Sequence, residues 1–182
     1  MKVAVILAEG FEEIEAISCV DVLRRAGIEV SVAGLASAEV SGAHGVRVVA
    51  DTTLGELRAE DLSAVVLPGG LPGAEHLANS SALKSLLVKM KNAGKIVAAI
   101  CAAPMALEAA GVLSESFVCY PGFEENVRAS ASGYVPNCDV LVSNGVITGK
   151  GPALSMKFAL EIVCALKGDE CAREVAAGLL FA

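Results

Sequence analysis

Five short runs of apolar, β-forming residues recur along the sequence, and helix-like segments stand between several of them. The runs cover residues 3–8, 29–33, 46–50, 64–67 and 96–100. Continuous apolar runs, unlike alternating ones, are typical of parallel strands that are buried on both faces. The alternation of strands and helices predicts an α/β protein with a doubly wound, mostly parallel sheet between helical layers.

The helical segments are bounded by recognisable signals. Amphipathic or apolar patterns predict helices over residues 13–26, 80–92, 104–110 and 153–166. A glycine follows each of them at the place where helices commonly end: Gly27, Gly94, Gly111 and Gly168. In the C-terminal third, Asn144-Gly145 separates two apolar runs within residues 139–149, and this pattern predicts an antiparallel β-hairpin.

Length and composition indicate one domain with an apolar surface. The 182 residues are enough for one well-buried core, so we expect a single domain over residues 1–182. Hydrophobic residues make up 54% of the chain and charged residues 19%. The first predicted helix carries more apolar residues than the stripe of a surface helix needs: Ile14, Ile17, Cys19, Val20, Val22 and Leu23. We therefore expect a homodimer that uses this helix.

Charge and cysteine spacing restrict the partners. The formal net charge of -7 disfavours binding to nucleic acid or to anionic membranes. The six cysteines lack the close pairs of zinc sites and redox dithiols, so no metal is expected. The apolar run at the start of the chain soon reaches acidic residues and predicts a core strand, not a signal peptide or a membrane span. We expect a cytoplasmic protein with reduced thiols.

One cysteine occupies a position that favours reactivity. In the stretch KIVAAICAAPMAL, a predicted strand ends at Cys101 and a helix begins with Pro104, which suits a first helical turn. A side chain at such a turn projects from the carboxyl end of the sheet, where open α/β proteins bind ligands. A helix N-terminus also favours a thiolate. We therefore expect Cys101 alone to have a strongly depressed pKa, whereas the other cysteines fit a structural, buried role.

Two neighbouring segments supply candidate partners for this cysteine. Gly69 and Gly70 in LPGGLPG follow the fourth run, where bare backbone can approach a ligand and N–H groups can bind an oxyanion. Of the four acids in AEGFEEIE, we expect most to be solvated or to be helix-start carboxylates favoured by the helix dipole. One that is buried beside Cys101 would have a raised pKa and would carry a proton at neutral pH. The chain has only two histidines and no phosphate-binding loop, which disfavours a Cys-His hydrolase and a nucleotide-binding protein.

A family resemblance covers essentially the whole chain. The segments VAVILAEGFEEIEAI, VDVLRRAGIEV, VVLPGG, AAICAAPMAL and the C-terminal helix resemble the ThiJ/PfpI superfamily, and most closely its parkinsonism-associated deglycase branch. The resemblance implies a flavodoxin-like fold, a dimer partly formed by the first helix, and no cofactor. It also implies that Cys101 is the nucleophile and Glu15 its protonated carboxyl partner.

The resemblance assigns further residues to the site. The N–H groups of Gly70 and Ala102 match the oxyanion-binding pair, and Arg25 matches an arginine near the site at the dimer contact. Tyr120 stands in place of a histidine and is expected to act as a hydrogen-bond donor or pocket wall. His44 replaces a second arginine. Ala102 also stands where protease-like relatives carry a histidine, which disfavours peptidase activity.

Three classes of function follow from these residues. The first is an enzyme acting on reactive dicarbonyls, either a glutathione-independent glyoxalase that converts methylglyoxal to lactate or a deglycase of early glycation adducts. The second is an oxidative-stress sensor or redox-regulated chaperone in which Cys101 is oxidised to a sulfinate. The third is an amidase or peptidase, which the residues favour least. The first two require the same cysteine and the same carboxyl group.

Overall fold

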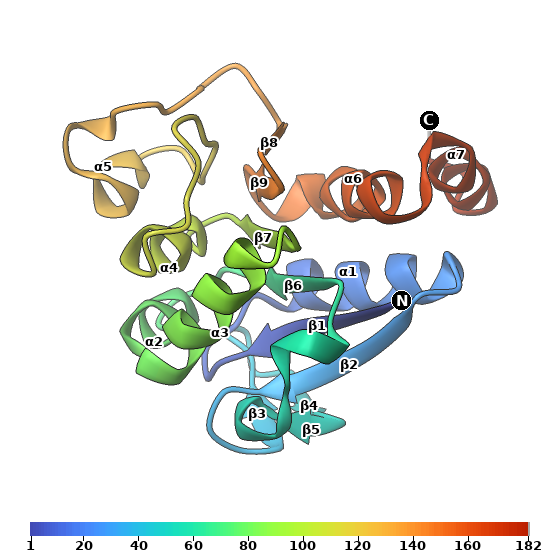
Figure 1. Ribbon diagram of the computed structural model, residues 1–182, viewed down its shortest axis with the longest axis horizontal. Helices are drawn as coiled ribbons and strands as arrows, with labels where there is room; N and C mark the ends of the chain where they lie inside the picture. The colour runs from blue at the N-terminus through green and yellow to red at the C-terminus, as the bar shows by residue number, and fades with distance from the viewer. Residues whose placement is uncertain (182) are drawn as a thin grey trace.

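The computed structural model describes residues 1–181, in which seven strands form one curled sheet with helices on both faces (Figure 1). The spatial order is β5-β2-β1-β6-β7-β9-β8, and every neighbouring pair is parallel except β8 and β9. The bounds are β1 Lys2–Leu7, β2 Glu29–Gly34, β5 Thr52–Thr53, β6 Ala64–Leu67, β7 Ile96–Ile100, β8 Val140–Ser143 and β9 Val146–Gly149. This is the predicted α/β class, and its flavodoxin-like fold agrees with the resemblance.

The helices divide between the two faces of the sheet, as Figure 1 shows. One layer contains α1 (Glu13–Arg25), α6 (Ser155–Lys167) and α7 (Asp169–Gly178). The other contains α2 (Gly73–Asn79), α3 (Ser81–Asn92) and α4 (Pro104–Ala109). Each layer has its own apolar core, with Phe158 buried under the first and Leu87 and Met90 under the second. The sheet is thus covered on both faces, as its continuous apolar strands require.

Most predicted boundaries hold to within two residues. Strands β6 and β7 match the predicted runs, and the C-terminal hairpin forms with Asn144 and Gly145 at its turn. Both turn residues have positive φ, as a two-residue hairpin turn demands. The glycines predicted to end helices also adopt positive φ: Gly27, Gly94, Gly111 and Gly168. Local turn chemistry therefore positions the elements that carry the site.

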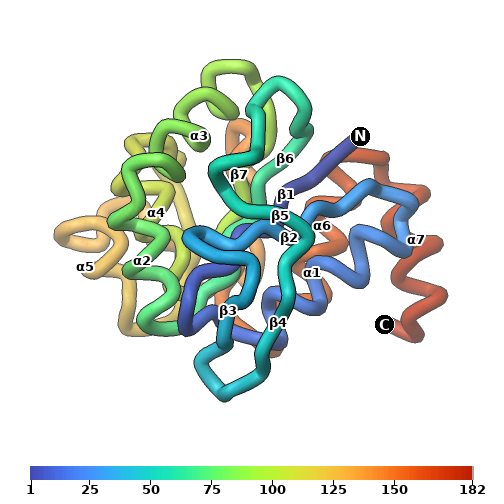
Figure 2. Tube along the Cα trace, turned by 90° about the horizontal axis from the view of Figure 1, so that it is seen from below, coloured from blue at the N-terminus to red at the C-terminus, as the bar shows by residue number. Residues whose placement is uncertain are grey.

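The run at residues 46–50 is not a core strand, and that prediction is wrong. Residues Arg47–Val49 form β4, which pairs antiparallel with β3 (Glu39–Ser41) in a separate two-stranded ribbon. Val49 is 74% exposed, because the ribbon projects from the body of the molecule (Figure 2). The sheet position next to β2 belongs instead to β5. A short apolar run predicts a strand but does not show which other strand it will pair with.

Several short elements were not predicted. They are α2, α7, the single-turn α5 (Glu124–Val127) and four 3-10 segments at Leu54–Glu56, Ala59–Asp61, Ala129–Ala131 and Pro152–Leu154. The helix α5 lies in the long connection between α4 and β8, well outside the two main layers (Figure 1). This connection carries Tyr120, so its placement matters for the site.

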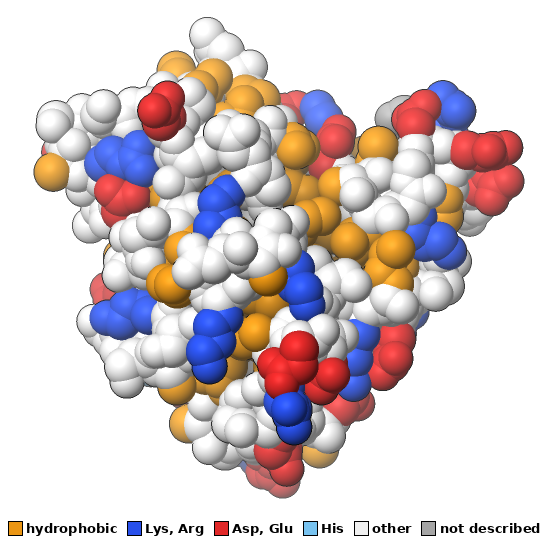
Figure 3. Space-filling model, in the orientation of Figure 1, with side chains coloured by type: hydrophobic (Ala, Val, Ile, Leu, Met, Phe, Trp, Pro, Cys, Tyr) orange, Lys and Arg blue, Asp and Glu red, His pale blue; other side chains and the backbone are white. Residues whose placement is uncertain are grey.

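On the face drawn in Figure 3, Lys and Arg side chains are separated from one another and interspersed with Asp and Glu. No helix within residues 1–181 is long and apolar enough to cross a membrane.

Candidate active site

Cys101 lies at a sharp turn between β7 and α4. Its φ is 63°, a left-handed conformation that non-glycine residues adopt rarely and that costs about 1–3 kcal/mol. The main chain on both sides is fixed, since the Cys101 N–H donates to the Gly149 carbonyl at 2.9 Å and its carbonyl accepts from the Tyr120 N–H at 3.0 Å. The predicted strand-to-helix elbow is therefore present, and the surrounding fold holds its strained residue in place.

Glu15 lies in the first turn of α1 and has no exposed surface. Its Oε2 accepts a hydrogen bond from the Gly69 N–H at 2.7 Å. The preceding turn is fixed to the same segment, because the Glu12 N–H donates to the Gly69 carbonyl at 2.9 Å. The Glu12 carboxylate also caps the helix by accepting from the Glu15 N–H at 2.7 Å. Gly69 thus joins the start of α1 to the end of β6.

Gly69 allows the carboxyl group and the thiol to approach each other. A β-carbon at this position would lie 2.7 Å from Cys101 Cβ, 2.9 Å from Glu15 Oε2 and 3.0 Å from the Ile100 carbonyl oxygen. These distances are well inside van der Waals contact. The thiol and the carboxyl group are hydrogen-bonding partners. The predicted Cys101–Glu15 pair is therefore brought together by a residue whose side chain must be absent.

The pKa of Glu15 is shifted towards neutrality. Burial raises the pKa from 4.5 to about 7, and the neighbouring Glu12 carboxylate contributes through its charge. Hydrogen bonds with the Gly69 N–H and with Cys101 oppose the rise. The second oxygen, Oε1, is buried and has no hydrogen-bond partner among residues 1–181. A group with this pKa can both donate and accept a proton at neutral pH.

The expectation of a strongly depressed Cys101 pKa is wrong for the state in which Glu15 is ionised. Burial raises the pKa of the thiol to about 12, and the charge of Glu15 adds to the rise, whereas N–H groups of Gly70 and Ala102 oppose it. The helix that was expected to favour the thiolate, α4, has only six residues and so a weak dipole. Protonation of Glu15 removes the carboxylate charge. The thiolate therefore forms more readily beside a neutral Glu15 than beside an ionised one.

The predicted oxyanion-binding groups face the sulfur. The N–H groups of Gly70 and Ala102 are the two backbone donors that stabilise a negative charge on Cys101. The Gly69 N–H is already committed to Glu15, so it orients the carboxyl group and is not available for substrate. This arrangement resembles an oxyanion hole, in which preoriented N–H groups stabilise charge that develops during reaction.

The remaining predicted site residues divide into near and distant ones. Tyr120 adjoins the elbow through its backbone, and its ring packs against Gly151, where a β-carbon would lie 3.2 Å from the ring. It is thus placed as a wall. Arg25, at the other end of α1, is exposed and pairs with Asp21 at 2.7 Å, so within one chain it does not join the site. His44 lies on the β3–β4 ribbon.

The acids that flank Glu15 are helix-start carboxylates, one of the two expected roles, but they are not solvated. Glu12 and Glu13 are both buried. Glu13 accepts hydrogen bonds from the His44 N–H at 2.6 Å and from His44 Nδ1 at 2.9 Å. Burial alone would raise the pKa of Glu13, but these bonds and one from the Val46 N–H outweigh it, and the pKa is lowered. The helix start therefore uses Glu12 as a cap and Glu13 to hold the β3–β4 ribbon.

Glu12, Glu13 and His44 also form a cluster whose side-chain atoms are spaced like the ligands of a metal ion. Ligand atoms of Glu12, Glu13 and His44 lie within 4.8 Å of one another. The hydrogen bonds to the helix start and to the ribbon account for both carboxylates. The cluster is thus explained by structural contacts.

The other five cysteines are free thiols, and three of them, Cys138, Cys164 and Cys171, are only partly buried, contrary to the expected buried role. Cys19 is fully buried in α1, and burial raises its pKa far above the usual value. Burial also raises the pKa of Cys119 to about 12. Neither residue shares the turn, the paired N–H donors or the partner carboxyl group of Cys101.

Comparison with known proteins agrees with this geometry. Residues 1–165 match the DJ-1/PfpI family, and the chain belongs to that family. The protein named Protein dj-1beta from Drosophila melanogaster is 43% identical over 180 residues, which cover 98% of this chain and 96% of the relative. A Caenorhabditis elegans relative, named Glutathione-independent glyoxalase DJR-1.2, is 36% identical over 162 residues, or 89% of this chain and 86% of the relative.

Solved structures show the same fold over the full chain. Drosophila melanogaster DJ-1beta superposes with a TM-score of 0.94 at 42% identity, covering 100% of this chain and 98% of that one. Toxoplasma gondii DJ-1, solved in an oxidized form, gives a TM-score of 0.92 at 41% identity with the same coverage. The resemblance inferred from the sequence motifs is confirmed.

The first prediction concerns Gly69. Gly69→Ala should push the Cys101 and Glu15 side chains apart and lower the free energy of unfolding by about 1–3 kcal/mol, as overpacking of a buried site usually does. Gly55→Ala is the matched control, because a β-carbon there meets nothing within 4 Å. Chemical denaturation measures both. Equal stability of the two variants would contradict the close approach described here.

The second prediction concerns pH and stability. The unfolded chain returns Glu15 to its usual pKa of 4.5, whereas the folded protein holds it at about 7. The protonated form therefore stabilises the fold below pH 4.5, and this stability is lost as pH rises to about 7. Glu15→Gln should thus raise the free energy of unfolding at pH 8 by up to about 3 kcal/mol, at roughly 1.4 kcal/mol per unit of pKa. At pH 4 the two proteins should be nearly equally stable. A constant difference across this range would contradict the raised pKa.

Proposed function

We propose that the protein is a cysteine-dependent glyoxalase that converts methylglyoxal to lactate without glutathione or another cofactor. The observation that carries this proposal is the buried Glu15 carboxyl group beside Cys101, with a pKa of about 7 and one oxygen that no other described residue hydrogen-bonds. The printed name of the Caenorhabditis elegans relative supports the same activity.

The first step joins the substrate to the enzyme. The Cys101 sulfur adds to the aldehyde carbon of methylglyoxal and forms a C–S bond, while the carbonyl π electrons move onto oxygen. The Gly70 and Ala102 N–H groups, which face the sulfur, stabilise the resulting oxyanion. The proton shared by Glu15 and Cys101 then neutralises this oxygen, and the product of the step is a hemithioacetal.

The second step moves hydrogen between adjacent carbons. The Glu15 carboxylate removes the proton from the carbon bound to sulfur, which gives an enediolate with its charge on the former ketone oxygen. The hydroxyl proton on the carbon bound to sulfur passes to that oxygen, and the protonated Glu15 returns its proton to the neighbouring carbon. The carbon bound to sulfur becomes a thioester carbonyl, and the former ketone becomes a secondary alcohol. One group serves as base and then as acid, so a pKa near neutrality suits both roles.

The third step releases the product. Water adds to the thioester carbonyl, the C–S bond breaks, and lactate leaves with the Cys101 thiol regenerated. Glu15 is the carboxyl group placed to accept a proton from the attacking water. The whole sequence needs no oxidant, because one carbon is oxidised as its neighbour is reduced. Removal of early glycation adducts would use the same first addition, so the deglycase activity remains part of this proposal.

A second candidate is an oxidative-stress sensor or redox-regulated chaperone. The oxidized Toxoplasma gondii structure shows that a close structural relative has been observed in that state. In this chain, the same N–H groups and a protonated Glu15 could bind the oxygens of a Cys101 sulfinate. Dicarbonyl turnover by the reduced protein distinguishes the enzyme from the sensor.

The third prediction tests the proposed roles directly. Cys101→Ser should abolish lactate formation, and Glu15→Gln should reduce kcat/KM for methylglyoxal by about two to four orders of magnitude, the usual loss for a general acid-base. Glu170→Gln, at an exposed acid in the first turn of α7, is the matched control and should retain activity. Lactate is measured enzymatically. Near-normal turnover by Glu15→Gln would show that another group moves the proton.

We also propose that the protein forms a homodimer through α1. Ile14 and Ile17 are 57% and 48% exposed on the outer face of this helix, where an isolated chain would leave two large apolar side chains in water. The same helix carries Glu15, so a symmetric contact here would stabilise the segment that holds the catalytic carboxyl group.

The fourth prediction concerns this contact. Sedimentation at micromolar concentration should give a dimer for the natural sequence and a monomer for the Ile14→Lys, Ile17→Lys double variant, since two charges would be buried at the contact. Val142→Lys, at an equally exposed valine on β8, should remain dimeric. A monomer for the natural sequence would contradict the proposal.

A further inference from the structure

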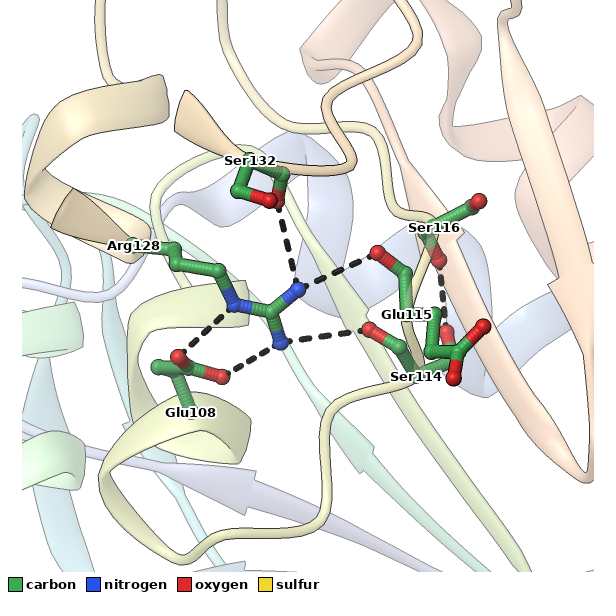
Figure 4. A network of polar contacts seen from close by, with 6 residues as sticks. All are labelled: Glu108, Ser114, Glu115, Ser116, Arg128 and Ser132. Atoms are coloured by element: carbon green, nitrogen blue, oxygen red, sulfur yellow. Dashed lines mark hydrogen bonds and ion pairs between the residues drawn. The ribbon is translucent and has the colours of Figure 1, made fainter. Parts of the chain in front are cut away.

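Arg128 connects α4 to the long segment that follows it (Figure 4). Its Nε and Nη2 donate to the two carboxylate oxygens of Glu108 at 2.8 and 2.7 Å. Nη2 also donates to the Ser114 carbonyl at 3.2 Å, and Nη1 to the Glu115 and Ser132 carbonyls at 3.1 and 3.3 Å. The five N–H groups of the guanidinium thus all have acceptors.

This contact is stronger than an ordinary surface ion pair. The side chains of Arg128 and Glu108 are 21% and 32% exposed, and their geometry is bidentate. The guanidinium carbon lies 5.4 Å from the ring centroid of the fully buried Phe117. Hydrogen bonding to Glu108 raises the pKa of Arg128, so the arginine stays charged. A partly buried guanidinium whose N–H groups all have acceptors fixes geometry more than an exposed pair does.

The segment that Arg128 holds is also tied to the elbow. The Phe117 N–H donates to the Gly133 carbonyl at 3.0 Å, which pairs two lengths of the segment. The Val118 N–H donates to Thr148 Oγ1 at 3.0 Å, and the Tyr120 N–H donates to the Cys101 carbonyl at 3.0 Å. The Glu115 carbonyl accepts a hydrogen bond from Arg128, and only four residues, 116–119, separate Glu115 from Tyr120. Arg128 therefore holds the same segment that carries Tyr120, a few residues before it.

Glu108, the partner of Arg128, lies on the helix that follows the proposed nucleophile. Glu108 lies in the last turn of α4, the helix that begins three residues after Cys101. Arg128 therefore holds the helix that follows the nucleophile and the segment that carries Tyr120. Next to Tyr120 lies a small cavity of about 160 Å³, whose wall is completed by Pro121 and residues 150–154. Two residues link this cavity to the Cys101 backbone by hydrogen bonds: Tyr120, which lines the cavity, and Gly149, which directly precedes the lining residues 150–154.

We propose that Arg128 is a positioning residue that fixes Tyr120 as the wall of the substrate pocket, and that this cavity receives the substituent of the dicarbonyl. The inference rests on the proposed glyoxalase function. Arg128 touches neither the thiol nor Glu15. Its loss should therefore weaken substrate binding and leave the reactivity of Cys101 unchanged. Substituents larger than methyl should be affected most, because they reach further along the wall.

Kinetics with two dicarbonyls test the role in binding. Arg128→Met should raise KM for phenylglyoxal about tenfold, equivalent to roughly 1.4 kcal/mol, with a smaller effect on methylglyoxal and little change in kcat. The rate of Cys101 alkylation by iodoacetamide should remain within about twofold of the natural protein, because that reaction needs no pocket wall. Arg58→Met, which removes an exposed arginine paired with Glu60, is the matched control.

A second measurement reports the wall directly and does not depend on turnover. The chain has no tryptophan and only two tyrosines, so a Tyr134→Phe background leaves Tyr120 as the only strong fluorophore. Adding Arg128→Met should lower the fluorescence anisotropy of Tyr120 and increase its quenching by acrylamide, whereas adding Arg58→Met should change neither. Arg128→Lys keeps the positive charge but loses the planar guanidinium, so its Tyr120 anisotropy and quenching should lie between those of the natural protein and of Arg128→Met. Arg128→Lys replaces Arg128→Met if the methionine variant does not fold.

The outcomes separate the two proposals. Unchanged Tyr120 anisotropy in both Arg128 variants would overturn the positioning role, whatever the activity. A mobile Tyr120 with an unchanged KM for phenylglyoxal would overturn the link between the wall and the substrate. If the natural protein converts neither dicarbonyl, the glyoxalase proposal fails, and the anisotropy still decides whether Arg128 fixes Tyr120.

Discussion

The hydrogen bond from the Gly69 N–H to Glu15 is the contact on which the site depends. It fixes the Glu15 carboxyl group in a fully buried place. Burial there raises the pKa of this group to about 7, although the hydrogen bond itself opposes part of the rise. The absence of a side chain at Gly69 then lets the Cys101 sulfur approach the same carboxyl group. In the proposed mechanism the reactivity of Cys101 comes from a proton shared with Glu15 and not from a helix dipole, because α4 is too short to stabilise a thiolate by itself.

The rest of the fold makes this costly arrangement persist. Three elements distant in sequence meet at the site: the first turn of α1, the end of β6 and the elbow after β7. Backbone hydrogen bonds from Cys101 to Gly149 and from Tyr120 to Cys101 hold the left-handed residue in place. On the other side, Glu12 and Glu13 fix the start of α1 to β6 and to the β3–β4 ribbon. Strain at the nucleophile and a buried acid are thus supported by well-packed surroundings.

The sequence predicted the parts of the fold that local chemistry decides. Buried strands, helix-ending glycines and the Asn144-Gly145 turn follow from single segments, and the position of Cys101 after a strand indicated its role. The family resemblance was needed to choose Glu15 among four neighbouring acids. Residues 46–50 were misassigned because strand pairing is a long-range choice. The burial of Glu12 and Glu13 and the contacts of Arg128 also join distant segments, so no local pattern could reveal them.

The central claim is that Glu15 and Cys101 share one proton, and a titration of the thiolate tests it most directly. The ultraviolet absorbance of the Cys101 thiolate, obtained as the difference from Cys101→Ser, would be followed with pH in the natural protein and in Glu15→Gln. Groups that share a proton interact by more than about one pKa unit, so the account predicts titration midpoints that differ by at least this much. Coincident curves in the two proteins would show that the two groups titrate independently, and would contradict the account.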